Sequence, residues 1–137
     1  MHIILQLYWW RYNMFILSQY RHHFLQENVM KFDDIKKALI DLLEDGKADT
    51  FVSMMSEDFE MLSIHKSSVG AQGKNREEAI EMMNKLETIA DANVKCQIQT
   101  PNTIVVTHNS INGEITLAAN QIKDGKINKC VYFRGPK

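Results

Sequence analysis

Residues 94–134 read VKCQIQTPNTIVVTHNSINGEITLAANQIKDGKINKCVYFR and decide the fold. Apolar and polar side chains alternate through this stretch, which is typical of β-strands with one buried face. Three turn signals interrupt the alternation: Pro101-Asn102, Asn112-Gly113 and Asp124-Gly125. The last two are strong hairpin signals, because both dipeptides tolerate left-handed backbone. The stretch therefore predicts an antiparallel meander of strands over 94–100, 103–109, 114–123 and 126–134.

Upstream of this meander the apolar period is helical. Apolar residues recur every three or four positions over 32–43 and over 75–90, and a shorter apolar side follows Asp49. Gly46 suits the left-handed cap that ends the first helix. Phe59–Ile64 alternates like a short strand, and Ser and Gly residues predict a loop over 67–73. This order predicts an α+β fold, in which three N-terminal helices pack on one face of a curved antiparallel sheet.

Composition and charge narrow the function classes. The chain has 137 residues, of which 45% are hydrophobic and 24% charged, so it can build one well-buried domain. A net charge of −1 gives no electrostatic reason to bind nucleic acid or an anionic membrane. The two cysteines, Cys96 and Cys130, form neither a disulfide framework nor a metal pattern, and we expect both to be buried thiols of a cytoplasmic protein.

The first 29 residues differ from the rest of the chain. They are rich in aromatic residues and poor in charge, and Arg11 and Asn13 interrupt their apolar run. That interruption argues against a signal peptide and against a membrane span of about 20 apolar residues. We expect residues 1–29 to be an extension that the fold does not need, and residues 30–137 to be the domain. The alternatives are a helix docked on the body or a helix used in self-association.

Three segments, taken with the predicted order of helices and strands, resemble a known family. They are SEDFEML (residues 56–62), GKNREEAIEMM (73–83) and DGKINKCVYF (124–133). With the turns at Asp45-Gly46-Lys47 and Asp124-Gly125-Lys126, residues 32–135 resemble the SnoaL-like branch of the nuclear-transport-factor-2-like superfamily. The resemblance implies a cone-shaped α+β barrel with a pocket open at one end, and dimers formed through the sheet. Members include ketosteroid isomerases, polyketide cyclases, epoxide hydrolases, dehydratases and non-catalytic scaffolds, so the fold does not fix the function.

The catalytic groups of the best-known branches are not matched. The Tyr and the two carboxylic acids of the ketosteroid isomerase type would fall near Leu39, Ser63 and Ala119 or Asn120, none of which supplies that chemistry. The Asp-Arg-Asp arrangement of an epoxide hydrolase of the limonene type would need an inward arginine. Arg134 is a candidate for it, but no inward Asp pairs with it. Whether the protein is an enzyme therefore stays open.

Two histidines are the candidate acid/base groups. Strand alternation places His108 on one face with Ile104 and Val106, and near the pocket rim if that face is concave. An imidazole suits proton transfer near neutral pH, whereas a half-exposed, idle histidine is the alternative. His65 precedes the polar loop and would contact a ligand if that loop covers the pocket mouth. The alternative is an exposed loop histidine.

The remaining candidates would bind a ligand. One of Asn120 and Gln121 must point inward, either as a structural hydrogen bond or as a ligand contact. Tyr132 shares a strand face with Cys130 and Arg134, and would offer its hydroxyl to a ligand or pack at a dimer interface. The predicted ligand-binding set is Met61, Ser63, Val106, Asn120 and Tyr132.

The sequence predicts a protein that binds a small, largely apolar molecule in the cone and forms a homodimer through the sheet. It predicts no cofactor and no metal, since glycine-rich phosphate loops and clustered Cys/His ligands are lacking. The alternative is a cofactor-free isomerase, cyclase or hydrolase with His108 or His65 as general acid/base.

Overall fold

The structure is a computed structural model that describes residues 29–65 and 72–136. Almost all of the N-terminal stretch 1–29 and most of the predicted loop lie outside the described residues, and the side chain of His65 does too. Within the described part the helices are α2 (Phe32–Leu43), α3 (Asp49–Met54) and α4 (Arg76–Asn84). The strands are β1 (Met55–His65), β2 (Gln72–Asn75), β3 (Lys95–Thr100), β4 (Thr103–Asn109), β5 (Glu114–Lys123) and β6 (Lys126–Pro136), with a 3₁₀ turn η1 (Ile111–Gly113).

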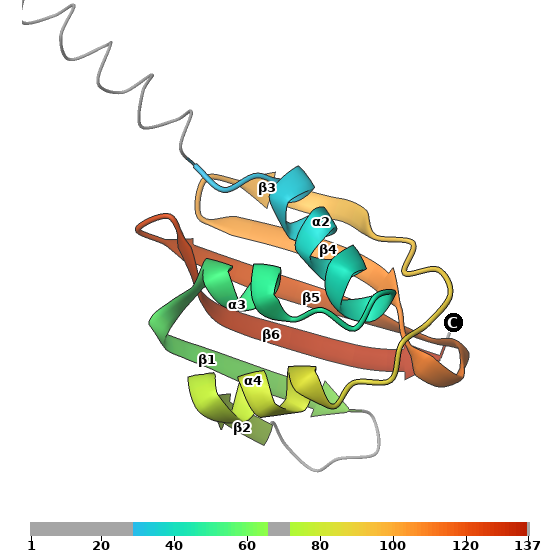
Figure 1. The fold of residues 1–137 in the computed structure, drawn as a ribbon. Coiled ribbons are helices and arrows are strands. Elements are labelled where there is room, and N and C mark those ends of the chain that lie inside the picture. Colours follow the sequence, from blue (N-terminus) through green and yellow to red (C-terminus); the bar gives the residue numbers. More distant parts are fainter. Residues whose placement is uncertain (1–28, 66–71, 137) are drawn as a thin grey trace, which may run out of the picture.

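The strands form one curved six-stranded sheet in the order β2-β1-β6-β5-β4-β3, and the helices pack on one side of it (Figure 1). The meander from β3 to β6 is antiparallel, as predicted. The sheet as a whole is mixed rather than antiparallel, because β1 pairs with β6 in parallel. The predicted α+β class and the helix-covered sheet are confirmed.

The main differences from the predicted elements lie between residues 55 and 90. β1 begins at Met55, directly after α3, and so is longer than the predicted strand. β2 was not predicted, because it contains Gly73, and glycine is typical of loops rather than strands. α4 ends at Asn84 rather than at Ala90. The chain then turns away, and the backbone N–H of Ile89 donates to the carbonyl of Leu43 at 2.8 Å.

The core lies between the helices and the concave face of the sheet. Phe59, Ile35, Ile104, Ile127, Val106 and Asn120 are its largest fully buried side chains. Along β4 every second residue is buried, so Ile104, Val106 and His108 share one face, as the alternation predicted, and that face points inward. Cys130 is buried as expected, but Cys96 is exposed. The prediction for Cys96 was wrong because β3 is an edge strand whose six residues are all exposed.

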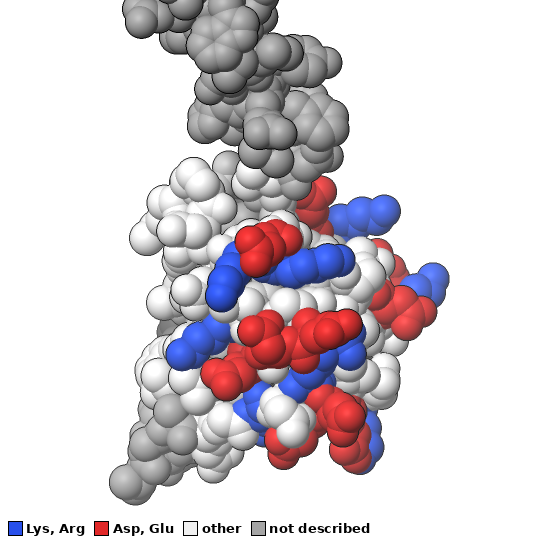
Figure 2. All heavy atoms as spheres, turned by 90° about the vertical axis from the view of Figure 1, so that its left-hand side faces the viewer, with Lys and Arg blue, Asp and Glu red and all other residues white. Residues whose placement is uncertain are grey.

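Basic and acidic side chains are interspersed on the molecular face shown in Figure 2. That face therefore lacks the continuous basic surface that follows a phosphate backbone. Among the described residues, no helix is long and apolar enough to cross a membrane.

The start of α4 depends on a capping box at Asn75. Its side-chain Oδ1 accepts from the N–H of Glu78 at 2.9 Å, and the Glu78 carboxylate accepts from the N–H of Asn75 at 3.1 Å. We expect Asn75→Ala to lower the free energy of unfolding by about 1 kcal/mol, the usual contribution of an N-cap. Asn84→Ala, at the exposed end of the same helix, is the matched control and should change it by less than about 0.5 kcal/mol. Urea denaturation measures both, and equal effects of the two substitutions would contradict this capping role.

Candidate functional site

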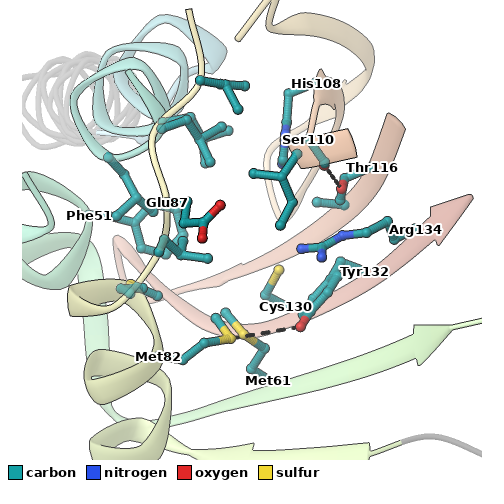
Figure 3. Close-up of a pocket in the computed structure, with 18 of the residues that line it drawn as sticks. Phe51, Met61, Met82, Glu87, His108, Ser110, Thr116, Cys130, Tyr132 and Arg134 are labelled. Atoms are coloured by element: carbon teal, nitrogen blue, oxygen red, sulfur yellow. Dashed lines mark hydrogen bonds between the residues drawn. The ribbon is translucent and has the colours of Figure 1, made fainter. Parts of the chain in front are cut away.

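A cavity of about 100 Å³ lies between the helices and the concave face of the sheet (Figure 3). Its walls are mainly apolar. The residues that line it are Leu39, Leu42, Leu43, Phe51, Met61, Met82, Met83, Leu86, Glu87, Ile89, His108, Ser110, Ile111, Thr116, Ala118, Asn120, Cys130, Tyr132 and Arg134. An engineered apolar cavity of about 150 Å³ holds benzene, and this cavity has about two thirds of that volume.

Strand register arranges the side chains on the concave face of β4, β5 and β6 in three rows, part of which lines the cavity. His108 of β4 pairs with Thr116 of β5, which pairs with Arg134 of β6. The next row is Val106, Ala118 and Tyr132, and the third is Ile104, Asn120 and Cys130. Side chains at paired positions share a sheet face, so the first row brings the His108 imidazole and the Arg134 guanidinium to one end of the cavity.

His108 is buried, with 8% of its surface exposed, rather than half-exposed. Its Nδ1 lies 2.8 Å from the backbone carbonyl oxygen of Asn109. A carbonyl only accepts, so Nδ1 carries the proton, and Nε2 keeps its lone pair in the neutral ring. Burial lowers the pKa of His108, the Asn109 carbonyl partly offsets this, and the charge of Arg134 lowers it further. The ring is therefore neutral at pH 7.

Arg134 is half-buried at the end of the same row. Its Nε is buried and has no hydrogen-bond partner among the described residues. Its guanidinium points into the cavity, and the carboxylate of Glu87 points toward it from the opposite wall (Figure 3). No described carboxylate forms an ion pair with Arg134, since the pair found among these residues joins Lys85 and Glu81.

The other polar side chains of the wall already form hydrogen bonds within the protein. Asn120 is 2% exposed, and its Nδ2 donates to the carbonyl of Ile104 at 3.2 Å. That bond fixes the amide and leaves its Oδ1 as an acceptor. The Tyr132 hydroxyl lies 3.9 Å from the Met82 sulfur, which is a weak acceptor. Ser110 and Thr116 share a hydrogen bond between their hydroxyls beside His108.

Cys130 contributes a neutral surface to the cavity. Burial raises the pKa of its thiol to about 12. Since only a thiolate is a good nucleophile, Cys130 is inert at neutral pH and behaves as a small apolar group.

The structure brings Met61, His108, Asn120 and Tyr132 to the cavity wall. Val106 is fully buried but does not line the cavity, and Ser63 does not line it either. The backbone of His65 pairs with Arg134, while its side chain lies outside the described residues. Within residues 29–65 and 72–136, no three His, Cys, Asp or Glu side chains are grouped as a metal site would need.

Sequence reasoning missed Glu87, Ser110 and Thr116 as cavity residues. Glu87 falls within the helix that the sequence predicted over 75–90, but α4 ends at Asn84 and the chain that follows brings Glu87 to the cavity. No signal in the sequence marks that early end. Thr116 was within reach, because strand alternation from Ala118 and Asn120 puts it on the concave face.

No model of a known protein family matches this sequence, and no curated protein matches it significantly. Solved structures do resemble the fold. A SnoaL-like protein of unknown function from Burkholderia thailandensis has a TM-score of 0.57 and 15% identity, over 75% of this chain and 92% of that one. An NTF2-like protein of unknown function from Burkholderia xenovorans has a TM-score of 0.55 and 16% identity, over 77% and 85%.

A protein from Sphaerobacter thermophilus has a TM-score of 0.60 and 9% identity, over 79% of this chain and 99% of that one. Identities this low carry the fold and nothing finer. The resemblance seen in the sequence is thus confirmed at that level: this chain has the fold of the SnoaL-like and NTF2-like proteins.

Proposed function

We propose that this protein binds a small, largely apolar molecule in the cavity on the concave face of the sheet. The observation that carries the proposal is a cavity of about 100 Å³ with apolar walls and one polar row at its end. Such a combination is typical of small-molecule sites, where apolar walls supply affinity and a few polar groups fix the orientation. The methionines Met61, Met82 and Met83 suit this role, because flexible thioethers adapt to a ligand's shape.

A second function is favoured by the state of His108. Its ring is held by the Asn109 carbonyl with Nε2 unprotonated, which is the state that a general base needs. A cofactor-free isomerase, cyclase or hydrolase would use Nε2 to take a proton from the substrate. Asn120 and Tyr132 would then orient the substrate. We keep this second to binding, because no described side chain pairs with the imidazole as the orienting acid of a catalytic pair would.

We further propose that the protein is a cytoplasmic homodimer that associates through the outer face of the sheet. Ile64, Ile98, Leu117 and Phe133 are 39%, 53%, 44% and 45% exposed. Leu117 pairs with Phe133, and Phe133 pairs with Ile64, so three of them form one apolar row across β5, β6 and β1. Contiguous exposed apolar surface of this kind marks interaction sites. The exposed thiol of Cys96 suits a reducing compartment.

Filling the cavity tests the binding function. Ala118 lines the cavity, whereas its neighbour Ala119 points to the other face of the sheet. We expect Ala118→Phe to weaken the binding of benzyl alcohol at least tenfold, and Ala119→Phe to leave it within about twofold, because only the first ring occupies the ligand's space. Chemical-shift titration of the full chain measures both affinities. Benzyl alcohol binding that survives Ala118→Phe would contradict a ligand site in this cavity.

The lowered pKa of His108 predicts a pH dependence of stability. The unfolded chain takes up a proton at this histidine near pH 6.5, while the folded chain resists it, so the unfolded state binds more protons below that pH. The free energy of unfolding should therefore be steady above pH 7.5 and fall as the pH drops through 6.5. Urea denaturation between pH 5.5 and pH 8 measures this, and His108→Asn should reduce the slope. An unchanged slope in His108→Asn would show that His108 does not resist protonation.

The dimer is tested by placing charge on the apolar row. We expect the double substitution Leu117→Lys and Phe133→Lys to convert the dimer to a monomer in sedimentation equilibrium, because burying two ammonium groups opposes association. Asn84→Lys, on the helix side of the molecule, adds charge without touching the row and should leave the dimer intact. A wild-type chain that sediments as a monomer would contradict this interface.

A further inference from the structure

Arg134 directs a permanent positive charge into an apolar cavity and has no ion-pair partner among residues 29–65 and 72–136. Its Nε is buried and unpartnered, and it donates no hydrogen bond to the described residues. A guanidinium cannot lose its proton at physiological pH, so it cannot escape the penalty of burial by becoming neutral. A buried charge is normally compensated by a partner of opposite sign. Arg134 is half-buried and its Nε is removed from water, so an anion bound in the cavity would supply the compensating charge that the described residues do not.

The neighbouring protein groups do not fill this need. His108, the other titratable group of the row, is neutral at pH 7. Glu87 is the carboxylate that lines the cavity, but it is an exposed residue on the opposite wall and forms no ion pair with Arg134 (Figure 3).

The surroundings of Arg134 define the shape of the missing anion. The rest of the cavity is formed largely by Leu, Met, Ile and Phe side chains, so the body of the ligand must be apolar. The hydroxyls of Ser110 and Thr116 lie in or beside the same row and are hydrogen-bonded to each other, so one of the two keeps a proton that it can donate to an anion. Arg134 is the cation that lines this cavity, and the carboxylate of Glu87 repels a ligand that carries more than one negative charge. One positive side chain therefore favours a monoanion over a phosphate dianion.

We infer that the ligand of this cavity is a small apolar carboxylic acid, whose carboxylate pairs with Arg134 while its apolar body lies against the Leu and Met side chains. The inference rests on the proposed function, since it needs the cavity to bind a small molecule. Arg134 would grip both carboxylate oxygens, because its planar fork of N–H donors matches them. The apolar body would then extend toward Tyr132 and Met61.

The test compares phenylacetate with phenylacetamide, which share a shape and differ in charge. Chemical-shift titration of the full chain should show phenylacetate binding at least tenfold more tightly than the amide. Arg134→Met keeps the aliphatic bulk and should reduce phenylacetate to the affinity of the amide. Arg76→Met is the matched control, because Arg76 also has a buried, unpartnered Nε but does not line the cavity. It should retain the preference for the acid.

A second variant guards against loss of folding in Arg134→Met. Arg134→Lys keeps the charge without the fork, and should retain a preference for the acid that is several-fold smaller than in the wild type. Equal binding of the acid and the amide to the wild type would overturn the carboxylate anchor and leave cavity binding intact. A preference for the acid that survives Arg134→Met would also overturn it. Failure of both probes to bind would overturn the anchor together with the proposed function.

Discussion

The cross-strand register of β4, β5 and β6 is the constraint on which the cavity depends. Side chains alternate between the two faces of a sheet, so a slip of one residue would turn His108 and Arg134 outward and bring the apolar outer row inward. Two turns hold this register. Asn112 and Asp124 adopt left-handed backbone, with φ of 62° and 52°, each followed by a glycine. The strands can therefore reverse direction at fixed positions.

The same register places the polar row of His108, Thr116 and Arg134 beside the apolar walls of the cavity. His108 stays neutral, and the Thr116 hydroxyl bonds to that of Ser110 beside the row, whereas Arg134 remains charged. The positive charge of Arg134 disfavours a second cation on His108, so the two side chains are coupled. An anion placed between them would relieve the one uncompensated charge. The charge of Arg134 and the polar row therefore both favour an anion at this end of the cavity.

Much of this arrangement could be predicted from local sequence patterns. The period of two in β4 put His108 on one face with Ile104 and Val106, the period in β5 required one of Asn120 and Gln121 to point inward, and the glycine turns indicated where the strands end. What failed depends on tertiary contacts. α4 ends early where the Ile89 backbone bonds to α2, β2 forms around a glycine by pairing with β1, and Cys96 is exposed because its strand is at an edge. No local pattern records those contacts, and Glu87 was missed for the same reason.

A crystal structure of the full chain grown with phenylacetate tests the central claim most directly. The account predicts one phenylacetate in the cavity, with both carboxylate oxygens within hydrogen-bond distance of the Arg134 guanidinium and the ring among Met61, Met82 and Leu42. The opposite result would be a cavity closed by its own Met and Leu side chains, with Arg134 paired to Glu87. In that case the concave face would be a packed core, and the polar row would serve stability rather than binding.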